Sequence, residues 1–97
     1  LYASLKNAIE GLTKYMAKEL APLKIRVNCI APGATETDFR GGFIRDNKVA
    51  NANVASLTAA GRVGLPDDIA NAIYAITLDD FTWVNAQRIE ASGGQAI

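Results

Sequence analysis

The chain has 97 residues, of which 49% are hydrophobic, and its ten basic residues balance ten acidic ones. This length allows at most one modest domain, and the composition is that of a folded protein rather than a disordered tail. The net charge is zero, and the basic residues form no stripe along the sequence. Electrostatics therefore give no reason to propose nucleic acid or an anionic membrane as a partner.

Cys29 is the only cysteine, and the chain has no histidine. A lone thiol excludes an internal disulfide and favours a reducing compartment, so we expect a cytoplasmic location. Zinc or copper would need unusual ligands here, and we predict no metal site. Because Leu1 opens directly into a helical pattern, we expect further residues upstream of it.

A helix followed by a strand is predicted for the first third of the chain. Apolar residues recur at three- and four-residue steps over residues 5–20, which indicates an amphipathic helix that ends near Ala21, before a proline. Residues 25–31 are rich in β-branched side chains and mostly apolar at both alternating positions. This pattern predicts a strand covered on both faces and ended by Pro-Gly at 32–33. This order is the αβ step of a parallel α/β sheet.

Residues 34–64 carry a weak pattern, which predicts helix interrupted by turns within a mobile functional loop or a poorly ordered one. A helix is predicted to start at Pro66, with acidic residues in its first turn, and to fade at 79–80. Its expected buried face consists of Ile69, Ile73 and Ile76. Residues 83–91 read as a loop that leads into a short strand, closed by glycines at 93–94.

Tyr2 and Lys6 stand four residues apart on the first predicted helix, so their side chains share one face. A free phenol ionises too far above neutral pH to serve as a general acid–base. A neighbouring ammonium favours the phenolate, which makes the pair a workable acid–base device. Taken alone, this spacing more often reflects a half-buried tyrosine beside a solvated lysine.

Several motifs follow one another in a characteristic order. They are Tyr-x-x-x-Lys at 2–6, Glu-Leu-Ala at 19–21, Arg-Val-Asn at 26–28, Pro-Gly at 32–33, Gly-Leu-Pro-Asp at 64–67 and Gly-Gly at 93–94. In this combination the whole chain resembles the short-chain dehydrogenase/reductase family. The resemblance implies the carboxy-terminal part of a Rossmann-like, doubly wound parallel α/β sheet, without its amino-terminal strands and Gly-rich loop. We therefore interpret residues 1–97 as the catalytic and substrate-covering portion of one incomplete Rossmann-like domain.

The resemblance implies an enzyme that uses NAD or NADP to interconvert a small alcohol and a carbonyl by hydride transfer. Tyr2 would exchange a proton with the substrate oxygen. Lys6 would assist Tyr2 and hydrogen-bond the nicotinamide ribose. Pro32 and Gly33 would bring backbone close to the nicotinamide ring, and Thr35 would hold its carboxamide through main-chain groups.

The resemblance also bears on residues with weaker signals. Thr37 would contact the carboxamide or the pyrophosphate. Phe39 and Phe43 fall in the substrate-covering segment by position only, so they face a substrate or merely pack. Asn28 and Ser4 do not match the catalytic asparagine and serine of the family, which lie upstream. For Asn28 we expect hydrogen bonds to neighbouring backbone.

Important family elements lie outside this sequence: the phosphate loop, the residue that reads the adenine ribose, and the catalytic asparagine and serine. Without the phosphate cradle the main source of dinucleotide affinity is missing, so we predict that the isolated chain is inactive. The alternative is a non-catalytic remnant that acts as a self-association module, because the strand at 25–31 would expose an apolar edge and face. The resemblance implies a homo-oligomer, a dimer or tetramer. The tail also departs from the family pattern, with Asn85-Ala86 where Thr-Gly is usual and Ala91-Ser92 where Val-Asp is usual.

Overall fold

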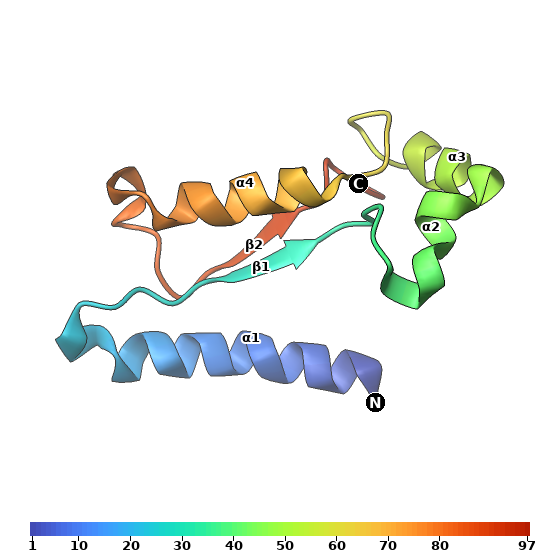
Figure 1. Ribbon diagram of the computed structural model, residues 1–97. Helices are drawn as coiled ribbons and strands as arrows, with labels where there is room; N and C mark the ends of the chain where they lie inside the picture. The colour runs from blue at the N-terminus through green and yellow to red at the C-terminus, as the bar shows by residue number, and fades with distance from the viewer. The chain divides into compact units, whose positions relative to one another are not determined.

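The computed structural model describes residues 1–97 (Figure 1). In chain order its elements are α1 (Tyr2–Glu19), the 3₁₀ turn η1 (Ala21–Leu23), β1 (Cys29–Pro32), η2 (Phe39–Gly42), α2 (Phe43–Asp46), α3 (Lys48–Ser56), α4 (Pro66–Thr77), η3 (Asp79–Phe81) and β2 (Arg88–Ala91). The residues fall into two compact units, Leu1–Ile30 with Tyr74–Ile89 and Ala31–Ile73 with Glu90–Ile97. None of the helices has the length and apolar content needed to cross a membrane.

β1 and β2 lie side by side in a two-stranded sheet (Figure 1). The Cys29 N–H donates to the Gln87 carbonyl at 2.8 Å, and the Gly33 N–H donates to the Ala91 carbonyl at 3.1 Å. Both bonds join residues the same distance apart in the sequence, so the strands run parallel. The predicted α/β order with parallel strands is therefore present.

The first predicted helix is confirmed as α1, which ends at Glu19, three residues before Pro22. Thr13 and Ala17 are its buried residues, and the Thr13 hydroxyl donates to the Ile9 carbonyl at 2.8 Å. The remaining apolar face is largely exposed, and Tyr15, in the carboxy-terminal half of the helix, is 70% exposed. A helix of this kind normally buries such a face against another layer of the fold.

Exposure of large apolar side chains extends over the whole chain. Only Ala17 and Val63 are buried apolar residues, while the large side chains of Leu12, Phe39 and Trp83 are exposed. Apolar surface of this extent is unusual for a self-sufficient domain and marks surfaces that pack against other protein. This agrees with the prediction that the sheet lacks neighbouring elements.

The strand predicted at 25–31 is wrong in its bounds, because β1 begins at Cys29 and includes Pro32. The preceding residues are held by side-chain amides instead of a regular ladder. Val27 N–H donates to Asn85 Oδ1 at 2.9 Å, and Asn28 Nδ2 donates to the Val84 carbonyl at 3.0 Å. The Asn28 Oδ1 also accepts the Gln87 N–H at 3.0 Å, which confirms that Asn28 serves neighbouring backbone.

Arg26 holds the carbonyl groups at the end of α4 and in the loop that follows. Its guanidinium donates to the carbonyls of Ile76 at 3.0 Å, Phe81 at 2.8 Å and Val84 at 3.2 Å. The last carbonyls of a helix lack partners within the helix, so a cation placed there supplies both hydrogen bonds and favourable charge. Arg26 thus fixes the loop that leads from α4 toward β2.

The middle of the chain contains η2, α2 and α3, as the prediction of interrupted helix suggested. Asn47 caps α3, since its Oδ1 accepts the Ala50 N–H at 3.0 Å. The next helix, α4, begins at Pro66 as predicted. The expected buried face is wrong, because the Ile73 side chain is 48% exposed and Ile69 and Ile76 are only partly buried. A helix buries its apolar stripe only where a second layer covers it, and this chain supplies none at Ile73.

The predicted strand before the closing glycines is confirmed as β2, Arg88–Ala91. Ahead of it, Ala86 adopts a left-handed φ of 60°. The resemblance noted from the sequence places glycine at this position, where such a conformation is free of Cβ strain. Alanine there costs about 1 kcal/mol.

Candidate functional site

Tyr2 and Lys6 lie together on the first two turns of α1. The Lys6 Nζ stands over the Tyr2 ring, 5.5 Å from its centroid. The Tyr2 side chain is 66% exposed. A cation over an exposed aromatic ring stabilises the pair by about 0.5–1 kcal/mol. The predicted juxtaposition is therefore present, with the tyrosine open to a ligand.

Residues 32–35, called the 32–35 segment, begin at the last residue of β1 and are held by hydrogen bonds to the carboxy-terminal residues. The Gly33 N–H donates to the Ala91 carbonyl at 3.1 Å, and the Ala34 N–H donates to Gln95 Oε1 at 2.7 Å. A Cβ on Gly33 would lie 2.7 Å from both Cα and Cβ of Ser92. Glycine is thus required by close backbone approach.

Thr35 forms a parallel bridge with Gly64. The Glu36 N–H donates to the Gly64 carbonyl at 2.9 Å, and the Gly64 N–H donates to the Ala34 carbonyl at 3.1 Å. Backbone groups alternate in direction along an extended segment, so the N–H and C=O of Thr35 itself face away from Gly64. Neither makes a hydrogen bond within the chain. The free Thr35 N–H can donate to the oxygen of a carboxamide, and the free Thr35 C=O can accept from the carboxamide NH₂ group.

The remaining predicted site residues lie in and after the next turn. The Thr37 hydroxyl accepts the Phe39 N–H at 3.2 Å. Phe39 opens η2 and is 67% exposed, and Phe43 opens α2 and is 53% exposed. Neither ring is part of a core, which leaves both available to a ligand or to further protein.

Glu36 and Asn51 form a polar contact that the sequence analysis missed. Asn51 Nδ2 donates to Glu36 Oε1 at 2.7 Å and to the Ile44 carbonyl at 3.2 Å. This contact joins α3 to α2 and to Glu36, the residue after Thr35. No motif connects residues fifteen positions apart, so the sequence carried no signal for it.

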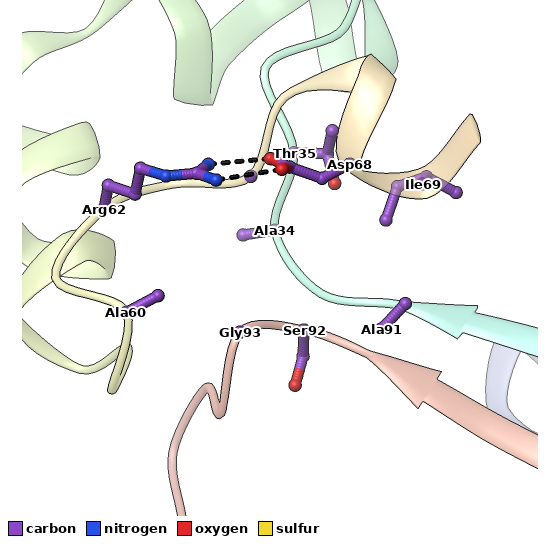
Figure 2. A pocket seen from close by; sticks show the side chains of 10 residues that line it. Ala34, Thr35, Ala60, Arg62, Asp68, Ile69, Ala91, Ser92 and Gly93 are labelled. Atoms are coloured by element: carbon purple, nitrogen blue, oxygen red, sulfur yellow. Dashed lines mark hydrogen bonds and ion pairs between the residues drawn. The ribbon is translucent and has the colours of Figure 1, made fainter. Parts of the chain in front are cut away.

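A pocket of about 200 Å³ adjoins Thr35 (Figure 2). It is lined by Ala34, Thr35, Ala60, Arg62, Gly64, Asp68, Ile69, Ala91, Ser92 and Gly93. Figure 2 shows the guanidinium of Arg62 facing the carboxylate of Asp68, with two hydrogen bonds of 2.7 and 2.9 Å. Because the two charges satisfy each other, the pocket presents no free charge to a ligand. We interpret the residues that line this pocket as packing that holds Thr35 in place.

A second pocket, of about 410 Å³, lies in the other unit, between α1 and the two strands. Two of its charged groups form a pair, since the Arg88 Nε donates to Glu10 Oε1 at 2.8 Å. Free Cys29 forms part of its lining. No predicted site residue contributes to this pocket.

Asp68 links the pocket to the start of α4. Its Oδ2 accepts the Leu65 N–H at 2.7 Å. The hydrogen bond from Arg62, followed by the one from Leu65, holds the pKa of Asp68 well below its usual range. The same ion pair raises the pKa of Arg62.

We expect Asp68→Asn to make the free energy of unfolding depend less on pH in the acidic range than it does in the wild type. A carboxyl with a depressed pKa stabilises the fold above its unfolded value, about 3.9, and this contribution is lost as pH falls toward the folded value. The asparagine side-chain oxygen can still accept the Leu65 N–H, but the side chain carries no negative charge to pair with Arg62. Urea unfolding midpoints at pH values between neutral and about 3 measure the effect. Asp67→Asn is the matched control, and an equal flattening in that variant would contradict the assignment to Asp68.

A family model described as enoyl-(acyl carrier protein) reductase matches residues 1–96. The chain belongs to the short-chain dehydrogenase/reductase family. The family resemblance expected from the sequence motifs is thereby confirmed.

Three similar proteins illustrate the family. The chain is 38% identical over 96 residues to an uncharacterized oxidoreductase of Methylorubrum extorquens, covering 97% of this chain and 38% of that protein. A solved structure of the promiscuous reductase LugOII, described as catalysing keto-reduction at C1 during lugdunomycin biosynthesis, has a TM-score of 0.87 and 38% identity, and the match covers 99% of this chain and 37% of that one. A 3-oxoacyl-[acyl-carrier protein] reductase from Brucella melitensis with bound NAD has a TM-score of 0.80 and 34% identity, covering 99% and 33%.

These likenesses confirm a partial Rossmann fold for the chain. The chain spans 38%, 37% and 33% of the three relatives, little more than a third of their length. It is therefore an oxidoreductase-family sequence that corresponds to one part of those proteins.

The predicted site residues of this short-chain dehydrogenase/reductase sequence fall into two groups. The structure brings Tyr2 and Lys6 together in one unit, and it places Gly33 near Thr35 in the other, where the Thr35 hydroxyl donates to the Gly33 carbonyl at 3.0 Å. Sequence reasoning missed Gln95, which holds the 32–35 segment. The only available signal was a long polar side chain placed directly after the closing glycines.

Proposed function

We propose that this chain is the carboxy-terminal catalytic portion of an NAD(P)(H)-dependent oxidoreductase that interconverts an alcohol and a carbonyl. The observation that carries the proposal is the placement of Lys6 over an exposed Tyr2, 5.5 Å from its ring centroid, in a chain of this family. In reduction the Tyr2 hydroxyl donates a proton to the carbonyl oxygen, and in oxidation the phenolate accepts it. Lys6 places a positive charge beside the Tyr2 ring, 5.5 Å from its centroid.

The dinucleotide, when bound, supplies or accepts the hydride at its nicotinamide ring. The unpaired N–H and C=O of Thr35 fit the carboxamide of that ring, and the close-packed Gly33 lets backbone approach the ring face. Lys6 donates to the ribose hydroxyls. Thr37 uses one lone pair for the Phe39 N–H, so its own O–H remains to donate to the carboxamide or the pyrophosphate.

The substrate is a small alcohol or ketone that Phe39 and Phe43 help to cover. Both rings are exposed and lie on short helices directly after the 32–35 segment. The carbonyl class is supported by two relatives, one described by its keto-reduction and one as a 3-oxoacyl reductase. The single free thiol, Cys29, supports a reducing, cytoplasmic location.

A second candidate function is a non-catalytic module for self-association. It is favoured by the exposed apolar side chains of α1 and α4, which a second copy could cover to form a dimer or tetramer. In the enzyme interpretation the same faces pack in part against the amino-terminal strands. The two interpretations differ in dinucleotide binding, which only the enzyme requires.

We expect the protein expressed from the full reading frame that encodes this chain, called the complete enzyme, to oxidise NADH or NADPH in the presence of ketones. The 97-residue chain by itself is expected to show neither turnover nor calorimetric binding of either dinucleotide. Absorbance of the reduced dinucleotide, read with a panel of ketones on both samples, measures this. Turnover by the short chain would contradict its predicted inactivity. A product of the full reading frame that self-associates without binding dinucleotide would favour the second candidate.

A further inference from the structure

We infer that Gln95 is a positioning residue that orients the 32–35 segment toward the nicotinamide end of the dinucleotide. The inference rests on the proposed function and extends it to a residue outside the motifs. Gln95 Oε1 accepts the Ala34 N–H at 2.7 Å, the shortest hydrogen bond made by this segment. The Ala34 N–H belongs to the peptide between Gly33 and Ala34, so this bond fixes the peptide directly before the one that carries the free Thr35 N–H.

The side chain of Gln95 is itself held in place at its base. Its backbone forms an antiparallel bridge with Thr58, and the adjacent Ala96 N–H donates to the Leu57 carbonyl at 2.7 Å. The Gln95 N–H donates to Ser92 Oγ at 3.3 Å, and that hydroxyl donates to Glu90 Oε1 at 2.6 Å. The acceptor oxygen is thus placed before any ligand arrives, and preorganised groups lose little entropy on binding.

Packing supports the same role. A Cβ on Gly33 would lie 2.9 Å from Gln95 Oε1, so the amide fills the space beside the glycine. Ala34 is only partly exposed, and its N–H would lose its acceptor if the glutamine were shortened or made apolar. An unpaired, partly buried donor costs free energy, and the segment would move to find water. A shift of about 1 Å at a ligand-contacting group is enough to weaken productive binding.

The effect should be confined to one end of the dinucleotide. In our proposal the adenosine end is bound by residues upstream of this chain, whereas Thr35 meets only the carboxamide. ADP-ribose lacks the nicotinamide ring and its carboxamide. Its affinity therefore separates a positioning role from general damage to the fold.

The test replaces Gln95 in the complete enzyme. Gln95→Met keeps a side chain of similar length without the acceptor and is expected to raise the Kd and KM for NAD(P)H about three- to tenfold. The Kd for ADP-ribose is expected to stay within about twofold of the wild-type value, because no contact to the adenosine end changes. Gln95→Glu retains an acceptor oxygen at the same position and is expected to restore near wild-type binding. Gln87→Met is the matched control, since the Gln87 amide donates only to the nearby Asn85 carbonyl at 3.0 Å.

The outcomes separate the possible failures. Equal weakening of NAD(P)H and ADP-ribose, or no weakening of either, would overturn the positioning role, as would a Gln95→Glu variant as weak as Gln95→Met. If Gln95→Met does not fold, Gln95→Asn retains the amide but is too short to reach Ala34, and the same expectations apply to it. A wild-type protein that binds no dinucleotide would instead refute the proposed function, while leaving the Gln95 contact as a structural one.

Discussion

Tyr2→Phe is expected to lower the kcat of the complete enzyme by about 10²–10⁴-fold, because the substrate oxygen then has no proton donor or acceptor. The ring remains, so the contact with Lys6 at 5.5 Å is retained and the helix is undisturbed. Dinucleotide affinity is therefore expected to stay close to the wild-type value. Steady-state kinetics with NAD(P)H and a ketone, together with calorimetric binding, measure both quantities.

The chain offers a matched control for this substitution. Tyr15 lies on the same helix and is 70% exposed, and Tyr15→Phe removes a hydroxyl without touching the pair. Its kcat is expected to be unchanged. A Tyr2→Phe enzyme that keeps more than about a tenth of wild-type kcat would show that the proton is supplied elsewhere. A parallel loss in Tyr15→Phe would point to the stability of α1 instead of chemistry.

The sequence was most informative where local physical rules decide the structure. α1 follows a three- and four-residue apolar period and ends just before Pro22, and α4 begins at a proline followed by two acidic residues. Both helices were predicted correctly because these signals act on the helix itself. The Tyr-x-x-x-Lys pair belongs to the same class, since its juxtaposition needs only helical geometry.

Features that depend on distant residues were predicted poorly. The strand at 25–31 was expected from β-branched composition, but its true start at Cys29 depends on side-chain amides of Asn28 and Asn85 that replace the ladder. Gln95 and Ala34 are 61 positions apart, and nothing in the local pattern connects them. Contacts of this kind arise from tertiary structure. Hydrophobic periodicity and turn-forming residues are local patterns and carry no information about them.

The exposed apolar faces connect the fold to the proposed function. α1 carries Tyr2 at its amino end, and its apolar face is open along most of its length. A catalytic tyrosine must be held within a narrow range of geometry, which in turn requires a rigid helix. A helix that buries little of its apolar face within this chain gains that rigidity only from further protein. We therefore expect the isolated chain to be inactive.

Gly33→Ala is expected to disrupt the 32–35 segment more severely than any change at Gln95. The new Cβ would lie 2.7 Å from the Cα of Ser92, a backbone atom that cannot swing aside as a side-chain tip does. Overpacking of this kind costs about 1–3 kcal/mol of folding free energy. Because the displaced backbone leads directly to Thr35, NAD(P)H affinity is expected to fall by about tenfold or more.

Gly11→Ala provides the matched control for this glycine substitution. A Cβ there meets nothing within 4 Å, and Gly11 lies inside α1, so alanine is expected to stabilise the fold by about 0.5–1 kcal/mol without changing NAD(P)H affinity. Urea unfolding of the complete enzyme carrying each substitution measures stability, and calorimetric titration of the same variants with NAD(P)H measures affinity. Wild-type stability and affinity in Gly33→Ala would mean that Ser92 and the 32–35 segment can separate without consequence. The close approach at Gly33 would then have no part in binding the nicotinamide.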